Sequence, residues 1–361
     1  MNRRIIIAAI CARPYVQAAV KAGFEVVAID IFADEETRHN AAETHIINSH
    51  DDGLDATELL ELLTLIVKTN DIFCFGAGFE RQPILLKKIA KLLPVLGNTP
   101  LTVHHANTAK LFFASLHNLS LTHPEVSFSG LKSTKNWLQK QSGGSGGGHI
   151  TRALPLQDIP PKLAHYYQRE VIGVPVSLLF LATDSDVHMI GFNKQWCAGT
   201  ALNPYRYGGA VSQTDLAQSI KGTILDAANK IAKDLKLIGI NSLDCIVDGE
   251  IVWILELNAR LSATLDLYEN TDGDLFSAHI AACLGSAVEL PVLSQSSNAH
   301  HVIYANEGCV VPVNMGWPDY VLDRPVAGSI IEAGQPLCTV FARAENAEAA
   351  QQVVAEYAES L

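Results

Sequence analysis

The chain has 361 residues, of which 48% are apolar and 18% charged. This composition fits a well-packed soluble enzyme of two or three domains and excludes a globally disordered chain. The formal net charge of −12 argues against a nucleic-acid-binding protein and against binding to an anionic membrane surface.

No segment of the chain predicts export or insertion into a membrane. Arg3 and Arg4 followed by the apolar run 5–10 imitate a secretory signal, but Arg13-Pro14 closes this run early. A second apolar run follows at the spacing of a βαβ unit, so we interpret the first run as a buried strand. No apolar run reaches the length of a membrane span. The seven scattered cysteines lack a CxxC pair, which predicts free, buried thiols in a reducing cytoplasm.

Short apolar runs alternate with helical patterns through residues 1–97. Strands are expected near 5–9, 26–30, 45–48, 72–75 and 95–97, and helices near 14–21, 56–68 and 83–92. This alternation predicts an open parallel α/β sheet. The first βα turn lacks GxGxxG, so a Rossmann site, and with it an NAD-dependent dehydrogenase, is poorly supported.

Two polar features follow strands of this region. Asp30 ends the second strand and could hold a ribose, although a polar strand end is the commoner explanation. The loop Gly76–Glu80 follows the fourth strand, where α/β proteins bind substrates. Its glycines could equally serve only the turn, and the sequence leaves both interpretations open.

Residues 98 to about 117 predict one helix, which carries Lys110. A lone lysine on a helix is usually solvated surface. Short strands follow from about 120 to 195. Lys140 then runs into a glycine-rich segment, residues 143–148, which could be a flexible linker. Ordered stretches flank it on both sides, so we favour a flap whose backbone N–H groups approach phosphate oxygens; no GK[ST] follows, which excludes a Walker A loop.

The region from 213 to 235 predicts an amphipathic helix with Thr214 as its N-cap. Further helices are expected at 274–284 and at the acidic C-terminus, with strands at 301–304 and 337–342. The adjacent pair His300-His301 would point to opposite faces of a strand, so we do not assign a metal to it.

The most informative pattern is a hairpin with its turn at Asp248-Gly249. Alternation places Glu256, Asn258 and Arg260 on one face of the second strand, and Asp244 on the first strand could lie beside them. Two carboxylates and an amide oxygen without His or Cys suit Mg²⁺ or Mn²⁺. A surface hairpin often carries acids, but Glu256 follows a nearly unbroken apolar strand, where an unpaired carboxylate is costly.

The chain resembles the ATP-grasp superfamily in the order of Lys110, Lys140, the glycine-rich segment, the connector 168–173 and the acidic hairpin. This superfamily includes biotin carboxylase, D-alanine–D-alanine ligase and glutathione synthetase. The likeness is greatest to the predicted ATP-dependent carboligase group, and tyramine–glutamate ligase of methanofuran biosynthesis is a more distant relative. The resemblance covers nearly all of the chain. It implies an α/β fold with a parallel pre-grasp domain over 1–97, a linker helix and lid subdomain over 98–180, and a large antiparallel catalytic grasp subdomain over 181–361.

The resemblance also implies roles for individual residues. Arg260 and Lys140 would act in catalysis, and Asp244, Glu256 and Asn258 would hold the metal. ATP would be bound by Lys110, Lys140, Gly143, Gly144, Gly146, Gly147, Glu170, Val171 and Ile172. Four positions depart from the family: Ala109 replaces an Asp, Gln141 replaces a Pro, Asp244 is shorter than the frequent Glu, and Asn-Pro-Arg reads Asn258-Ala259-Arg260. The missing Asp beside Lys110 leaves open whether ATP binding is weakened.

The resemblance implies an ADP-forming ligase that joins a small carboxylate to an amine through an acyl phosphate, with ATP and Mg²⁺ or Mn²⁺ as cofactors. Methanofuran-type cofactor biosynthesis is one pathway it suggests, and a homodimer is expected because many relatives dimerise. The alternatives are a bicarbonate-activating enzyme like biotin carboxylase and a non-catalytic ATP-binding regulator. Substrate identity is not readable from the sequence, although the segment 193–197 could line an acceptor pocket.

Overall fold

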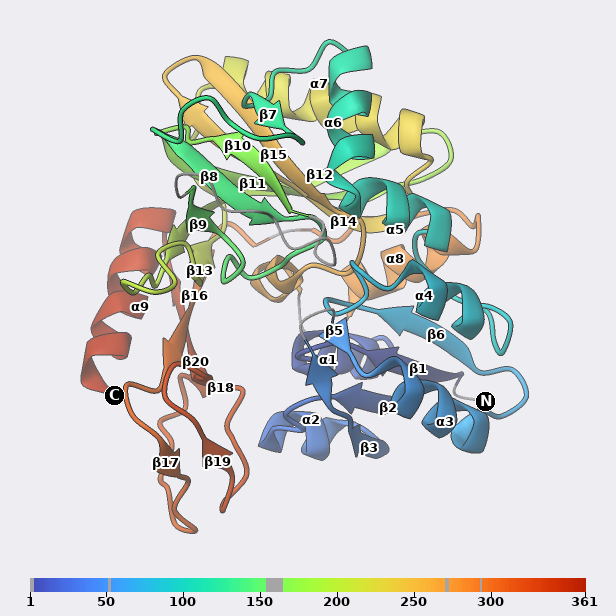
Figure 1. Cartoon of the computed structure of the whole chain (residues 1–361). Coiled ribbons are helices and arrows are strands. Elements are labelled where there is room, and N and C mark those ends of the chain that lie inside the picture. Colours follow the sequence, from blue (N-terminus) through green and yellow to red (C-terminus); the bar gives the residue numbers. More distant parts are fainter. Residues whose placement is uncertain (1–2, 51–52, 154–164, 270–272, 293) are drawn as a thin grey trace.

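The computed structural model describes residues 3–50, 53–153, 165–269, 273–292 and 294–361. Within this part of the chain, three larger sheets organise the fold (Figure 1). A parallel sheet belongs to the N-terminal domain, a small antiparallel sheet forms a lid, and an eight-stranded antiparallel sheet dominates the C-terminal half. None of the described helices combines the length and apolar composition that crossing a membrane requires.

The N-terminal sheet is parallel, as predicted, with strand order β3-β2-β1-β6. Its strands are β1 (Arg4–Ala8), β2 (Glu25–Asp30), β3 (Glu43–Ile46) and β6 (Ile72–Phe75); its helices are α1 (Arg13–Lys21), α2 (Glu35–Asn40), α3 (Ala56–Ile66) and α4 (Pro83–Ile89). A short ribbon joins β4 (Ser49–His50) to β5 (Gly53–Leu54). β1 and β2 are almost entirely buried, as expected of parallel strands that are covered on both faces.

In this domain one predicted strand was wrong and one helix was missed. The strand expected at 95–97 is reduced to one bridge between Phe73 and Val95. Helix α2 was not predicted, because it is too short to show a helical period; the side chain of Asp34 caps it by accepting from the Thr37 N–H.

A pair of helices leads into the lid. The single helix expected from 98 to 117 is two helices, α5 (Pro100–Asn107) and α6 (Ala109–Asn118), because the backbone of Thr108 is extended at φ −92° and ψ 99°. The lid sheet has the order β7-β10-β8-β9. Its strands are β7 (Val126–Ser127), β8 (Trp137–Gln141), β9 (Thr151–Arg152) and β10 (His165–Arg169).

The large sheet has the order β15-β14-β11-β12-β13-β16-β20-β18. These strands are β11 (Val174–Ala182), β12 (Val187–Cys197), β13 (Tyr207–Val211), β14 (Gly239–Asp248), β15 (Ile251–Asn258), β16 (Ser297–Tyr304), β18 (Val321–Leu322) and β20 (Pro336–Ala344). Beside them lie α7 (Gln218–Leu235), the 3₁₀ turn η1 (Ala263–Leu267), α8 (Asp274–Cys283), α9 (Ala347–Ser360) and the ribbon of β17 (Cys309–Val310) and β19 (Ile330–Ile331).

The start of α7 differs from the prediction. The helix begins at Gln218, and its N-cap is Ala217 without a side-chain cap, so Thr214 is not the capping residue. Thr214 instead donates its backbone N–H to the Phe192 carbonyl, a contact with β12 that lies three residues beyond the end of β13. The expected boundary between lid and grasp subdomain at 180/181 lies inside β11, and the chain passes from the lid sheet to the large sheet between Arg169 and Val174. The three domain ranges stay a prediction.

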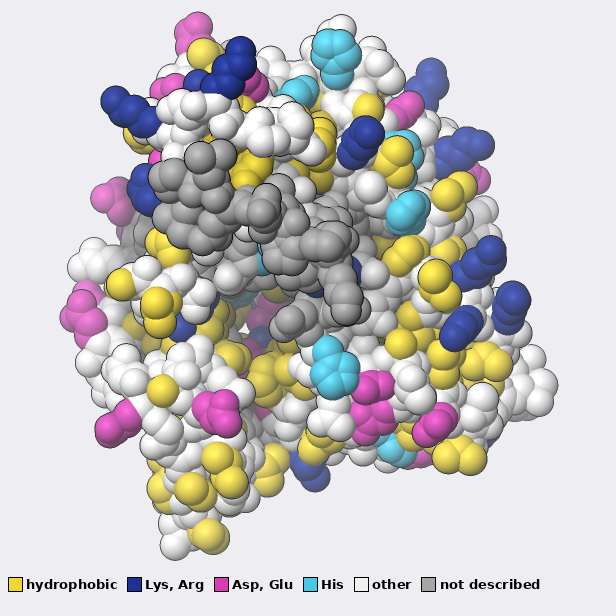
Figure 2. Space-filling view, viewed as in Figure 1, with side chains coloured by type: hydrophobic (Ala, Val, Ile, Leu, Met, Phe, Trp, Pro, Cys, Tyr) yellow, Lys and Arg dark blue, Asp and Glu magenta, His cyan; other side chains and the backbone are white. Residues whose placement is uncertain are grey.

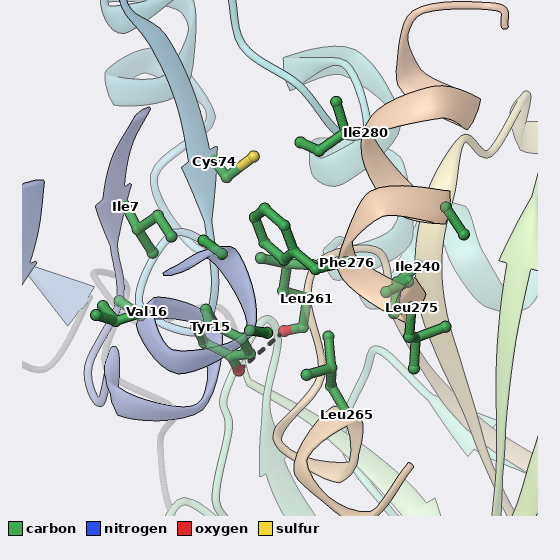
Figure 3. Packing of buried hydrophobic residues seen from close by; sticks show 14 of the residues in the cluster. Ile7, Tyr15, Val16, Cys74, Ile240, Leu261, Leu265, Leu275, Phe276 and Ile280 are labelled. Atoms are coloured by element: carbon green, nitrogen blue, oxygen red, sulfur yellow. Dashed lines mark hydrogen bonds between the residues drawn. The ribbon is translucent and has the colours of Figure 1, made fainter. Parts of the chain in front are cut away.

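One hydrophobic core runs through the contact between the N-terminal domain and the large sheet. Figure 3 shows Ile7, Tyr15 and Cys74 of the N-terminal domain packed against Ile240 of β14 and Phe276 of α8. Phe276 and Ile7 are fully buried. The side chains at the carboxyl end of the parallel sheet are therefore held at a fixed position relative to the large sheet.

Candidate functional site

The carboxylates of the C-terminal hairpin meet across β14 and β15. Asp244 is the direct partner of Glu256, and Ser242 is the partner of Asn258. The Asn258 amide nitrogen donates to Asp244 Oδ2 at 3.0 Å. The side chains that the sequence placed on one face thus form one oxygen-rich cluster. The hairpin forms as predicted, but its turn is Gly249-Glu250, one residue later than expected, since Asp248 still pairs with Ile251.

Crowding of acids makes a second negative charge in this cluster costly. Burial raises the pKa of Asp244, and the neighbouring carboxylate of Glu256 raises it further. Gln195 of β12 contributes an amide nitrogen 3.5 Å from Asp244 Oδ1, a long and therefore weak contact. Two adjoining carboxylates and an amide oxygen are a donor set that fits Mg²⁺ or Mn²⁺.

Lys140 approaches the cluster from the lid. It lies on β8 opposite Tyr166 of β10, and its ammonium is 3.8 Å from Glu256 Oε2. Only 3% of Lys140 is exposed. Burial lowers its pKa, but Tyr166 and Glu256 act in the opposite direction and the net shift is upward. Lys140 is therefore a buried, protonated cation beside the oxygen cluster.

Arg260 lies at the other side of the cluster, just beyond the end of β15. One terminal nitrogen donates to the Asn258 amide oxygen at 2.9 Å, and Nε donates to Glu80 Oε1 at 2.5 Å. Glu80 belongs to the loop Gly76–Glu80 at the carboxyl end of β6. The sequence left open whether this loop meets a substrate or only forms the turn. The ion pair of Glu80 with Arg260 was not predicted, since 180 residues separate the two in the chain.

The glycine-rich segment and the adjoining Ser142 are docked onto two other segments, the α5–α6 joint and the stretch 205–207. Ser142 accepts from the Ala109 N–H at 2.8 Å and donates to the Asn107 carbonyl at 2.9 Å. The carbonyl of Gly146 accepts from the Tyr207 N–H at 2.9 Å. A Cβ on Gly147 would lie 1.9 Å from the Tyr205 carbonyl oxygen, so only glycine allows this approach. The loop is thus a docked flap, which supports the flap interpretation over a free linker.

A small cavity of about 30 Å³ lies under this flap. It is lined by the α5–α6 joint, the start of the glycine-rich segment, Tyr166 of β10 and the end of β15, including Glu256 and Asn258. The flap, the lid sheet and the oxygen cluster therefore enclose one space.

The connector after β10 contributes mainly its backbone to this region. Arg152 contacts the Glu170 carboxylate at 3.2 Å, and the Tyr205 hydroxyl donates to it at 2.7 Å. Val171 is partly buried and Ile172 is 85% exposed. Gln168, which the sequence did not single out, is 2% exposed and its amide nitrogen is without a partner among the described residues. Gln168 shares the lid face of Tyr166 and Lys140, so this unused donor suits a polar ligand.

Lys110 is not brought into this cluster. It lies in the first turn of α6 next to Ala109, which lines the cavity, but its side chain is exposed. Asp30, by contrast, is fully buried and accepts from the backbone N–H groups of Ala12 and Ala33, at 3.1 and 2.6 Å. These bonds favour the structural explanation of Asp30 over ribose binding.

Charged side chains also join the N-terminal domain to the C-terminal half. Arg13 forms ion pairs with Asp266 at 2.8 Å and with Asp323 at 2.5 Å. Figure 2 shows a hollow in the middle of one face, with acidic and basic side chains in its depth. The sequence missed Arg13, because nothing local distinguishes it from a helix-start arginine. His300 and His301 have separate partners, Tyr207 and Trp196, and so form no pair site.

A parallel N-terminal domain, a lid with a glycine flap and a large antiparallel sheet bearing an oxygen cluster between two cations define an ATP-grasp fold. Residues 109–264 match the ATP-grasp domain family. The chain is 23% identical to the uncharacterized protein MJ0776 of Methanocaldococcus jannaschii over 385 residues, covering 99% of this chain and 93% of that protein.

Solved structures share the fold along nearly the whole chain. The biotin carboxylase domain of Hydrogenobacter thermophilus 2-oxoglutarate carboxylase, solved as a dimer with MgADP and bicarbonate, has a TM-score of 0.73 at 12% identity and 99% and 89% coverage of the two chains. The L-amino acid ligase of Bacillus licheniformis has a TM-score of 0.71 at 11% identity and 99% and 97% coverage. The Rhizobium etli pyruvate carboxylase, with a TM-score of 0.74 at 15% identity, is longer: 99% of this chain matches 37% of it.

Proposed function

We propose that the protein is an ATP-dependent carboxylate–amine ligase that forms ADP and a C–N bond through an acyl phosphate. The observation that carries this proposal is the oxygen cluster of Asp244, Glu256 and Asn258, which lies between the buried cations Lys140 and Arg260. A triphosphate with a bound divalent cation complements this arrangement: the metal meets the oxygen cluster, and the phosphates meet the two cations. The ligases among structures with this fold support the same class.

ATP would lie under the lid. The glycine flap of Gly143, Gly144, Gly146 and Gly147 would offer backbone N–H groups to phosphate oxygens, and Lys140 would neutralise their charge. The backbone of Glu170, Val171 and Ile172 would meet the adenine edge, which agrees with the Glu170 side chain being occupied by Arg152 and Tyr205. Lys110 would have to reach the phosphates from the first turn of α6, where its exposed side chain is free to change rotamer.

The metal site would consist of Asp244, Glu256 and Asn258. A bound Mg²⁺ or Mn²⁺ supplies charge neutralisation between the triphosphate and an incoming carboxylate. Arg260 would hold the transferring phosphoryl group, and Lys140 the phosphates next to it, which aligns the carboxylate oxygen with the γ-phosphorus. The closed flap would exclude water from the acyl phosphate until an amine attacks its carbonyl carbon and releases phosphate.

The substrates would be a small carboxylate and a small amine. Gln195, in the segment expected to line the acceptor pocket, contacts Asp244, so this segment borders the metal site. Glutamate and aromatic amines are the first compounds to screen, because the sequence resembles tyramine–glutamate ligase at a distance. A role in methanofuran-type cofactor biosynthesis rests on that resemblance alone. The proposal of a homodimer rests on the fact that many relatives dimerise.

The test is phosphate release with ATP and Mg²⁺ over a panel of amino acids and amines, with mass detection of the amide product. Release that requires both a carboxylate and an amine supports the ligase. Release that requires bicarbonate alone would replace it with a bicarbonate-activating enzyme, a reaction class suggested by the biotin carboxylase structures. Calorimetric nucleotide binding without turnover on any panel member would indicate a non-catalytic ATP-binding protein.

A further inference from the structure

The guanidinium of Arg260 is paired with a carboxylate of the N-terminal domain, that of Glu80. Its Nε donates to Glu80 Oε1 at 2.5 Å, one terminal nitrogen to Asn258 Oδ1 at 2.9 Å, and the other to the Leu261 carbonyl at 3.1 Å. The two side chains of the ion pair are 11% and 6% exposed. Water therefore does little to weaken this pair.

We infer that Glu80 is a positioning residue: it holds the Arg260 guanidinium by Nε, so that the terminal nitrogens remain turned toward the oxygen cluster. A guanidinium has five N–H donors, two on each terminal nitrogen and one on Nε. Among the described residues, one N–H on each terminal nitrogen is without an acceptor. These terminal N–H groups would be the donors that Arg260 offers to an oxyanion.

The loop that carries Glu80 is built to hold its carboxylate. The N–H of Gly78 donates to Glu80 Oε2 at 2.7 Å, so both oxygens of the carboxylate are engaged. Gly78 has φ +112°, and a Cβ there would lie 3.0 Å from Leu54 and 3.2 Å from Ile10. A residue other than glycine would strain this turn and move the bond to Glu80. The glycines thus serve the turn and, through it, the orientation of Glu80.

A second contact fixes the same segment. The Tyr15 hydroxyl donates to the Leu261 carbonyl at 3.2 Å, the bond drawn in Figure 3. The same carbonyl accepts from Arg260. The N-terminal domain therefore holds both the backbone and the side chain at the end of β15.

The geometry favours a role of Glu80 in orienting Arg260 over a role in stabilising the fold. A buried ion pair is a weak source of stability, because removing both charges from water costs about as much as their attraction returns. Arg260 without Glu80 would keep its charge but lose its fixed direction, and misorientation is costly for in-line transfer. The inference rests on the proposed function for the phosphoryl step, but the hold of Glu80 on Arg260 can be measured without it.

The first test is by NMR of arginine-labelled protein. The Arg260 Nε–H should give a slowly exchanging resonance, assigned by its loss in Arg260→Lys. In Glu80→Ala that resonance should broaden or exchange with water, whereas Glu80→Gln, which retains an acceptor, should keep it in part. Asp71→Asn is the matched control: it removes the partner of Arg4, a pair at 2.6 Å that is equally buried but lies near the amino edge of the same sheet. An unchanged Arg260 resonance in Glu80→Ala would overturn the inference.

The second test is kinetic. With substrates from the phosphate-release screen, Glu80→Ala should lower kcat by about 10²-fold, the typical loss for one oxyanion-stabilising donor, and leave the KM for ATP within about threefold. Glu80→Gln should fall between Glu80→Ala and the natural protein. A purely structural role predicts equal losses of stability in Glu80→Ala and Asp71→Asn with normal kcat in both, which would contradict positioning. If no panel member is turned over, the proposed function fails, and the NMR result still decides whether Glu80 holds Arg260.

Discussion

Asp244 and Glu256 are direct partners across the β14–β15 ladder, so two carboxylates occupy neighbouring positions on one face. The register shifts immediately after Asp244, so the paired acids stand at an irregularity of the sheet. Such bulges often re-aim side chains beside active sites. Burial and mutual repulsion disfavour two negative charges here, and a divalent cation would remove that cost.

The first prediction concerns this pair. Asp244→Asn should raise the melting temperature of the metal-free protein at neutral pH, because burial and repulsion raise the pKa of Asp244 and make its charged form costly. The same variant should lose the stabilisation that MgADP gives the natural protein. Both effects are read by thermal unfolding with and without MgADP. Asp248→Asn, at the exposed turn of the same hairpin, is the control and should change neither.

The second prediction concerns the lid cation. Lys140→Ala should reduce turnover by about 10²–10³-fold, because a buried cation near Glu256 is lost where charge develops. Lys135→Ala removes an exposed lysine of the same lid and should leave turnover unchanged. Equal turnover in the two variants would exclude Lys140 from the phosphate site.

A third prediction separates docking of the flap from backbone strain. Gly147→Ala places a Cβ against the Tyr205 carbonyl, whereas Gly146→Ala meets nothing within 4 Å, and both glycines have positive φ. The strain of a left-handed alanine is about 1–3 kcal/mol and should lower the population of the closed flap about 5- to 150-fold in Gly146→Ala. Gly147→Ala should impair closure of the flap more, which is measured as a lower kcat and as a higher sensitivity of the flap to protease. Equal effects would mean that contact with Tyr205 is unimportant.

The fourth prediction concerns pH and Asp30. Burial raises the pKa of Asp30 from 3.8 to about 6, in spite of its backbone hydrogen bonds. Because the folded pKa lies above the unfolded one, this contribution to stability is complete below about pH 4 and is lost as pH rises through about 6. The loss is about 3 kcal/mol from the size of the shift. Asp30→Asn lacks this titration, so its unfolding free energy relative to the natural protein should rise by that amount in urea titrations from about pH 4 to pH 7. Parallel pH profiles would contradict the assignment.

The chain's cysteines fit the prediction of free thiols, but not all are buried. Cys74, Cys245 and Cys338 are buried, while Cys197 and Cys309 are exposed. Apolar neighbours in the sequence did not reveal this difference. Cys197 ends β12 and Cys309 lies in the short β17 ribbon, where a strand's apolar character does not ensure that another layer covers it.

The sequence determined the local chemistry of the site. Alternation along a strand is a property of every β-strand, so Glu256 and Asn258 had to share a face once the hairpin was recognised. The glycine flap at 143–148 and the strands of the N-terminal sheet could also be predicted from the sequence. The first depends on local backbone freedom, and the second on the burial of consecutive apolar residues. Helix ends were harder to predict. Ser142 bonds to Ala109 and Asn107 on either side of Thr108, and Thr214 bonds to Phe192 instead of capping α7.

Only the tertiary structure decided which distant side chains meet. Glu80 reaches Arg260 because the carboxyl end of β6 packs against the end of β15, and no periodicity encodes that contact. Lys110 remains outside the cavity because α6 turns its side chain to solvent, although its neighbour Ala109 lines the cavity wall. A strand or a turn is specified by a few consecutive residues, whereas an ion pair between domains depends on how whole layers pack.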